Sequence, residues 1–290
     1  MLCYNQEMQK APSTTSAVDA TTIESFRHTV IEYYRANARH MPWREDTQPY
    51  FVLVSEIMLQ QTQVSRVLPK FAAFVQRFPT AQALAAAPLA DVITAWMGLG
   101  YNRRARFLHE AAKKVCQEYA GVFPASINEL MSLPGVGINT AGAIMAYAFN
   151  QPALYIETNV RTVYMHHFFA GIRNVTDKDI MSVLAASIDT KNPREWYWAL
   201  MDYGSHLKAT QPSNNAQSKH YKKQSRFAGS ARQIRGQILR LVMASPITLG
   251  ALEMKLSDAR VSNIVSDLLN DGLIEQRDND FYLTGQGQVS

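Results

Sequence analysis

The chain has 290 residues, of which 47% are hydrophobic and 18% charged, proportions that exclude a collagen-like, repeat-array or wholly disordered protein. Its two cysteines, Cys3 and Cys116, exclude a disulfide framework and any site that needs four thiolates from one chain. The net charge of +5 favours a polyanionic partner. The sequence has neither a membrane-length apolar run nor the apolar core of a signal peptide. We therefore expect no membrane contact and a cytoplasmic, nucleoid-associated location in a bacterium.

Residues 1–20 are rich in Ser, Thr and Ala without apolar periodicity, and we predict a disordered tail there. Residues 21–207 form one predicted domain, in which apolar residues recur at helical spacing and Pro or Gly punctuates most joints. The predicted helices span residues 23–37, 51–61, 64–78, 81–87, 89–97, 104–119, 127–133, 140–149, 159–169, 177–188 and 194–204. Almost no alternation of period two occurs, so this domain is predicted to be all-α.

Residues 208–228 are polar and basic, and we predict a linker or extended strap. No acidic residue occurs between Asp202 and Glu253. The strap lysines, Lys219, Lys222 and Lys223, are candidate contacts to a phosphate backbone. The alternative is a solvated linker with no binding role.

Residues 229–290 show a different pattern. Helices are predicted at 231–244, 249–256 and 258–270, followed by strands at 273–277 and 281–283 around a turn at 278–280. Three helices closed by a β-hairpin are typical of a winged helix. The segment carries six basic and seven acidic residues, so a module that packs against protein is an open alternative to one that binds DNA.

The segment Leu133-Pro134-Gly135-Val136-Gly137 lies between two predicted helices. Two glycines two residues apart allow a tight hairpin whose backbone amides point outward at a helix N-terminus. Such amides bind one phosphate of a nucleic acid without reading its sequence. The candidates for this contact are Gly135, Val136, Gly137 and Thr140. A lone pair of glycines is also consistent with a simple capping turn, but the flanking helices favour a helix–hairpin–helix motif.

Four segments in order carry a family resemblance: Trp43-Arg44, Ser55-Glu56-Ile57-Met58-Leu59-Gln60-Gln61-Thr62-Gln63-Val64, Gly98-Leu99-Gly100-Tyr101 and the LPGVG hairpin. Together they resemble the adenine DNA glycosylases of the MutY type, which belong to the helix–hairpin–helix (HhH-GPD) base-excision superfamily. The resemblance covers residues 40–207. It implies an enzyme that flips out adenine mispaired with guanine or 8-oxoguanine and hydrolyses its N-glycosidic bond. The expected partner is mismatched or damaged duplex DNA, bound by a monomer.

Glu56 is the candidate general acid. Adenine leaves poorly until a ring nitrogen is protonated, so the site needs a carboxylic acid that stays neutral near pH 7. An apolar environment favours the protonated form, and Glu56 is flanked by Val54, Ile57, Met58 and Leu59. Without the surrounding motif, an ordinary salt-bridged glutamate would be the simpler interpretation.

Glu157 departs from the family pattern. The family carries an aspartate before the Asn-Val segment that opens a helix, where its charge offsets the positive charge that develops on the sugar. Here the stretch reads Ile156-Glu157-Thr158-Asn159-Val160, so one methylene is added. Either the site is adjusted around Glu157, or activity is reduced or lost; Glu157 can also cap the helix. We place Asn159 beside it among the catalytic candidates.

Asn139 is the remaining catalytic candidate. In the lyase branch of the superfamily a lysine follows the hairpin at this place and forms a Schiff base with the sugar. Because asparagine stands here, the resemblance implies a monofunctional glycosylase without lyase activity.

The resemblance also implies residues that act on the DNA. Gln61 and Tyr101 match the residues that wedge into the base stack, and Arg104 is a candidate phosphate contact beside Tyr101, with Arg103 and Arg106 nearby. The candidates for the base pocket are Trp43, Arg44, Leu59 and Asp202. Tyr101 is also consistent with a half-buried aromatic on a turn.

No cofactor or metal is expected. The family usually carries a four-cysteine iron–sulfur cluster after the segment Met201–Gly204, and no cysteine occurs there. His166, His167, His206 and His220 lack the spacing of a helical metal pair. The family's Nudix-like C-terminal domain is also replaced by the winged-helix segment. Two alternatives stay open: a glycosylase for thymine or uracil opposite guanine, and a non-catalytic DNA-binding protein.

Overall fold

The computed structural model describes residues 18–211 and 227–287. Residues 1–17 of the predicted tail and the strap lysines lie outside these ranges, and the first helix begins at Ala20, the last residue of the predicted tail. Contacts between Cα atoms divide the chain into two compact units, each built from two stretches of sequence. Of the described residues, the first unit holds 18–40 and 145–211, and the second holds 41–144 and 227–287. The predicted domain boundaries stay predictions.

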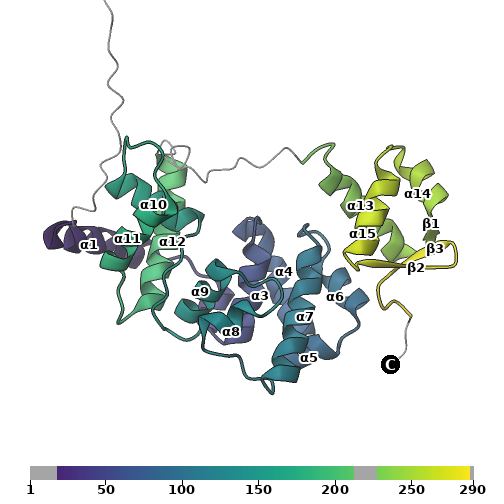
Figure 1. Ribbon diagram of the computed structural model, residues 1–290, viewed down its shortest axis with the longest axis horizontal. Coiled ribbons are helices and arrows are strands. Elements are labelled where there is room, and N and C mark those ends of the chain that lie inside the picture. The colour runs from purple at the N-terminus through teal and green to yellow at the C-terminus, as the bar shows by residue number, and fades with distance from the viewer. Residues whose placement is uncertain (1–17, 212–226, 288–290) are drawn as a thin grey trace, which may run out of the picture. The chain divides into compact units, whose positions relative to one another are not determined.

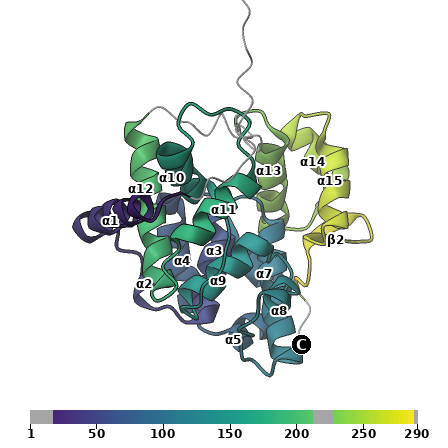
Figure 2. The same ribbon diagram turned by 60° about the vertical axis from the view of Figure 1, so that its left-hand side comes forward.

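The first unit is a helical layer around an aromatic core. It contains α1 (Ala20–Asn37), α10 (Thr158–Phe168), α11 (Asp177–Ser187) and α12 (Pro193–Thr210). Helices α10 and α12 lie side by side (Figures 1 and 2). The ring of Phe26 on α1 contacts Tyr164 at 5.3 Å and Trp196 at 5.7 Å between centroids, both edge-on. Such aromatic packing ties the three helices together.

The first part of the second unit is also helical. It contains α2 (Pro42–Glu45), α3 (Pro49–Leu59), α4 (Val64–Arg77), α5 (Ala81–Ala86), α6 (Leu89–Trp96), α7 (Arg103–Glu118), α8 (Ile127–Met131) and the start of α9 (Ile138–Tyr147). Helix α3 is apolar nearly all round, and seven of its eleven residues are buried. A helix of that kind forms the centre of a unit rather than its surface.

The second part of this unit is a C-terminal module (Figure 1). It comprises α13 (Ala231–Ala244), β1 (Ile247–Thr248), α14 (Leu249–Leu256), α15 (Val261–Asn270), β2 (Ile274–Arg277) and β3 (Asp280–Leu283). The strand order is β1-β3-β2, all antiparallel, with Ile247 opposite Phe281 and Ile274 opposite Leu283. This is the predicted winged-helix arrangement with one additional strand.

The predicted fold class is confirmed: the chain is mainly helical, with one small sheet at its C-terminal end. Helix α2 and strand β1 were not predicted, because four and two residues are too short to show a periodic pattern. Helix α12 continues to Thr210, and α15 begins at Val261 rather than at residue 258. None of the helices in residues 18–211 and 227–287 is long and apolar enough to cross a membrane.

Candidate active site

Glu56 lies in the last turn of α3, within an apolar stretch of that helix. Its neighbours Val54, Ile57 and Met58 are fully buried, while Glu56 itself is half-buried. Its backbone carbonyl accepts a hydrogen bond from the amide of Gln60, which closes the helix. The fold thus places one carboxyl group on the most apolar helix of the second unit, directly before the turn that carries Gln61.

Arg104 organises the chain that follows Glu56. Its side chain is buried, and Nη1 donates to the carbonyls of Ile57, Met58 and Gln60 at 2.6–2.9 Å. Nη2 donates to the hydroxyl of Thr62 and the carbonyl of Gly100, both at 3.0 Å. Burial lowers the pKa of this guanidinium to about 10, so it stays charged near neutral pH. Every one of these donors is directed at a protein acceptor, which gives Arg104 an internal role; its predicted phosphate contact stays a prediction.

Two turns meet at this arginine, and each contains a predicted wedge residue. Gln61 has φ of 55° and Tyr101 has φ of 49°, both in the left-handed region that side chains rarely adopt. Gly98 and Gly100 also have positive φ, which gives the second turn its tight course. Strained non-glycine residues concentrate at functional sites, where the surroundings hold them in place. The conformation of Gln61 and Tyr101 is therefore consistent with a functional role for both turns.

The glycine hairpin precedes α9. Gly135 has φ of 79°, and a Cβ atom there would lie 2.9 Å from the Cβ of Phe107. Gly137 and Asn139 are exposed at the start of α9, where backbone amides lack intrahelical acceptors. The structure thus has the predicted hairpin geometry at a helix N-terminus.

Two hairpin candidates have buried side chains. Val136 is 6% exposed, and the hydroxyl of Thr140 accepts a hydrogen bond from Nε2 of Gln60 at 3.3 Å. The Gln60 amide also donates to the carbonyl of Gly135 at 3.3 Å, so the hairpin is tied to the end of α3. The Thr140 side chain thus has an internal role, and the predicted contact of the hairpin's backbone amides with a phosphate stays a prediction.

Glu157 caps α10 in the first unit. Its Oε1 accepts hydrogen bonds from the amides of Asn159 at 2.6 Å and Val160 at 3.1 Å. The longer side chain therefore folds back onto its own helix, and the predicted capping role is present. Both bonds use one oxygen, which leaves Oε2 outside the cap.

Glu157 is half-buried, and its carboxyl lies close to a cation. Burial raises the pKa of this carboxyl, while the amides of Val160 and Asn159 and the charge of Lys208 act in the opposite direction. Desolvation likewise lowers the pKa of the Lys208 ammonium near the end of α12, and the charge of Glu157 raises it. Lys208 was not predicted as a site residue; its only signal was membership of the acid-free stretch.

Asn159 lies where α10 meets α12. Its Nδ2 contacts the sulfur of Met201 at 3.7 Å, and its buried Oδ1 has no hydrogen-bond partner among the described residues. A Cβ on Gly204 would lie 2.5 Å from the carbonyl oxygen of Asn159. Because only glycine allows this approach, Gly204 sets the distance between the two helices and the position of the Glu157 cap.

Two of the base-pocket candidates are part of the protein interior. Trp43 is 6% exposed and meets Phe71 edge-on at 5.1 Å. Asp202 is 2% exposed and accepts hydrogen bonds from the backbone amide of Arg39 at 2.9 Å and from its Nε at 2.6 Å. Both side chains have contacts within the protein, and their predicted role in the base pocket stays a prediction.

The other two base-pocket candidates, Arg44 and Leu59, are half-buried at the ends of α2 and α3. Their predicted role stays a prediction. The part of the chain that the structure describes contains no group of three His, Cys, Asp or Glu residues able to hold a metal ion.

Comparison with known proteins places these features in a family. Residues 54–187 match the family described as HhH-GPD superfamily base excision DNA repair protein. An adenine DNA glycosylase of Mycolicibacterium smegmatis is 36% identical over 285 residues, which cover 90% of this chain and 96% of that protein. An adenine DNA glycosylase of Buchnera aphidicola is 36% identical over 185 residues. The matched region covers 62% of this chain and 52% of that protein.

Among solved structures, a thermostable thymine-DNA glycosylase is 25% identical with a TM-score of 0.62, and the match covers 69% of this chain and 94% of that one. The order of the motifs and the hairpin before α9 are those expected of this family. The Mycolicibacterium smegmatis match extends over 90% of this chain. The chain belongs to the adenine DNA glycosylases, within the HhH-GPD superfamily of base excision DNA repair proteins.

Proposed function

We propose that this glycosylase removes adenine mispaired with guanine or 8-oxoguanine from duplex DNA by hydrolysis. The observation that carries the proposal is the place of Glu56, a carboxyl in the last turn of an apolar helix and directly before the left-handed Gln61. Membership of the family supplies the substrate class. The hairpin amides at Gly137 support binding of a DNA phosphate.

The chemistry divides between two carboxyl groups. Glu56 donates a proton to a ring nitrogen of the flipped adenine, and the electron pair of the glycosidic bond leaves with the base. Positive charge then develops on the sugar, where the Glu157 carboxylate offsets it. Water adds to the anomeric carbon and loses a proton, so the products are free adenine and an abasic site. Asn139 provides no amine for a lyase step.

The residues of this chain do not fit the iron–sulfur cluster of the wider family. Such a cluster needs four thiolates, and the sequence has two cysteines. We propose that the strap lysines provide phosphate contacts in its place and that the protein acts as a monomer on duplex DNA. Elemental analysis of purified protein tests the first point, since stoichiometric iron would contradict it.

A single-turnover assay tests the function. Duplexes with adenine opposite 8-oxoguanine, guanine, cytosine or thymine, and with thymine or uracil opposite guanine, are incubated with excess enzyme. We expect release of adenine opposite 8-oxoguanine and guanine. Glu56→Gln should abolish release, because no proton donor would remain, and Glu157→Gln should slow it by roughly 10²–10³-fold.

Matched variants sharpen the assay. Glu118→Gln changes a carboxyl whose side chain is 56% exposed on α7, and it should leave the rate unchanged. If the site is shaped around glutamate, Glu157→Asp should slow the reaction; if it is impaired by glutamate, Glu157→Asp should accelerate it. Release of thymine rather than adenine would favour the substrate of the similar thymine-DNA glycosylase. Background rates for every duplex and variant would leave only a DNA-binding role.

A further inference from the structure

The C-terminal module contacts the turn that carries Tyr101. Nη1 of Arg232 on α13 donates to the phenolic oxygen of Tyr101 at 2.6 Å. The guanidinium carbons of Arg232 and Arg104 lie 5.5 Å and 5.4 Å from the centre of the tyrosine ring. Cation–π contacts of this kind fix the orientation of an aromatic ring. Two arginines from different parts of the second unit therefore hold one strained tyrosine.

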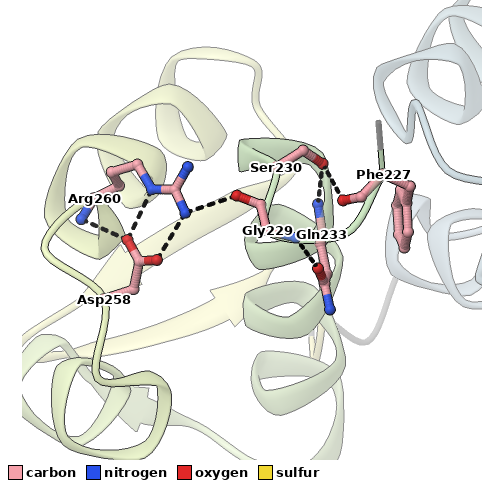
Figure 3. A network of polar contacts seen from close by, with 6 residues as sticks. All are labelled: Phe227, Gly229, Ser230, Gln233, Asp258 and Arg260. Atoms are coloured by element: carbon pink, nitrogen blue, oxygen red, sulfur yellow. Dashed lines mark hydrogen bonds and ion pairs between the residues drawn. The ribbon is translucent and has the colours of Figure 1, made fainter. Parts of the chain in front are cut away.

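The start of α13 is itself fixed by a polar network (Figure 3). Oγ of Ser230 accepts a hydrogen bond from the amide of Gln233 at 3.4 Å, and Oε1 of Gln233 accepts one from the amide of Gly229 at 2.7 Å. Arg260, from the start of α15, donates to the carbonyl of Gly229 at 3.0 Å and pairs with Asp258 (Figure 3). These caps hold the first turn of α13, and Arg232 lies in that turn.

The module as a whole is bound to α6 and α7. Arg106 on α7 donates to the carbonyl of Asp271 at 2.6 Å, and its guanidinium fills the space where a Cβ of Gly272 would lie. The carboxylate of Asp271 pairs with Arg103 of α7 and with Arg235 of α13. Arg103 and Arg106, the two cations near Arg104 on α7, thus hold the module.

Apolar packing adds to this attachment. Ala90 and Ile93 of α6 are buried in the same core cluster as the apolar residues of the module, such as Ile238 and Phe281. An interface with both a shared apolar core and paired charges favours one fixed arrangement. Arg232 is therefore presented to Tyr101 by a rigid support rather than by a loose arm.

We propose that Arg232 is a positioning residue for Tyr101, through which the C-terminal module takes part in the opening of the base stack. The inference rests on the proposed function, in which Tyr101 enters the DNA. A ring already oriented in the free protein loses less freedom when it inserts between bases, so binding and base release both become more favourable. The alternative for Arg232 is a direct contact to a DNA phosphate.

A double-mutant cycle separates these two roles. Tyr101→Phe removes the hydroxyl, and Arg232→Met removes the guanidinium but keeps an unbranched apolar stem. Duplex affinity and single-turnover base release are measured for wild type, both single variants and the double variant. Arg240→Met changes an exposed arginine on the same helix and serves as the control. Thermal unfolding of each variant shows whether it is folded.

If Arg232 acts through Tyr101, each single variant should lose about tenfold in duplex affinity and in the rate of base release. The double variant should lose no more than about twofold beyond the more impaired single variant. The slope of log affinity against log salt should also stay that of wild type. If the fold-losses of the two single variants multiply in the double variant, or if the salt slope of Arg232→Met is lower by about 0.9, the proposal is overturned in favour of a phosphate contact. An Arg232→Met variant equal to wild type would also overturn it.

Two other outcomes also bear on Arg232: a variant that does not fold, and a wild type that releases no base. If Arg232→Met fails to fold, Arg232→Lys replaces it, and a full retention of affinity and rate by the lysine variant would contradict a role that needs the planar guanidinium. If wild type releases no base from any duplex, the proposed function fails. The role of Arg232 is then tested by the duplex affinities of the double-mutant cycle alone. If the affinity losses of the two single variants multiply in the double variant, the positioning role is overturned as well.

Discussion

Replacement of Arg104 by methionine should destabilise the second unit strongly. The variant keeps the apolar stem but removes the Arg104 donor from the carbonyls of Ile57 and Met58. The carbonyls of Gln60 and Gly100 also lose this donor but keep the Thr62 hydroxyl at 3.3 Å and Nε1 of Trp96 at 3.2 Å. Each of the two carbonyls left unsatisfied, those of Ile57 and Met58, costs about 1–3 kcal/mol, so we expect a loss of about 2–6 kcal/mol in the free energy of unfolding. For a fold of this size the midpoint of thermal unfolding should fall by about 10 °C.

Urea unfolding followed by circular dichroism measures this loss. Arg103→Met is the matched control on the same helix: its side chain is 59% exposed and its ion pair with Asp271 spans 3.6 Å. A pair of that kind contributes less than about 1 kcal/mol. If Arg104→Met unfolds like Arg103→Met but binds DNA with a flatter salt dependence, the guanidinium acts at the DNA surface and the internal role is refuted.

Three further predictions concern the strap, the lyase step and the contact between α10 and α12. Alanine at all three strap lysines should weaken binding to every duplex alike and lower the salt slope by about 0.9 for each phosphate that is no longer neutralised; an unchanged slope would make the strap a linker. Borohydride should trap no covalent DNA adduct, because Asn139 has no amine, whereas efficient trapping would reveal another nucleophile. Gly204→Ala should cost at least about 1–3 kcal/mol in urea unfolding through its 2.5 Å approach to Asn159. Gly236→Ala on α13, with open space at its Cβ, should be neutral or stabilising by up to about 1 kcal/mol, and equal effects of the two changes would contradict the packing argument.

The helices could be predicted from the sequence because their apolar residues recur at a regular spacing. The same spacing could have predicted the burial of Arg104, because Arg104 lies on the buried face of α7 with Leu108, Ala111 and Val115. The phosphate assignment followed from its charge beside Tyr101 and did not take the phase of the helix into account. Burial of a charge is readable when it falls on an apolar face.

Other features depend on partners that are distant in sequence. Asp202 is paired with Arg39, 163 residues away, and Tyr101 is bonded to Arg232, 131 residues away. Neither partner has a spacing that links it to the other, so only the folded chain shows the pairing. The motif around Glu56, by contrast, is contiguous, and its placement on an apolar helix followed from local pattern.

The ionised carboxylate of Glu157, the form proposed to act in catalysis, should lower the stability of the folded protein. Burial raises its pKa above the ordinary 4.5, so its contribution to stability is fully present below that pH and is lost as the pH rises through the raised pKa. Glu157→Gln keeps an oxygen for the amides of Asn159 and Val160 without the charge. The midpoint of thermal unfolding of Glu157→Gln minus that of wild type should therefore grow from about pH 4.5 upward and then level off. A difference that is flat or falls with pH would mean that the charged cap stabilises α10. Retention of a carboxylate at a position where an amide is more stable at neutral pH would point to a need for its charge in the reaction.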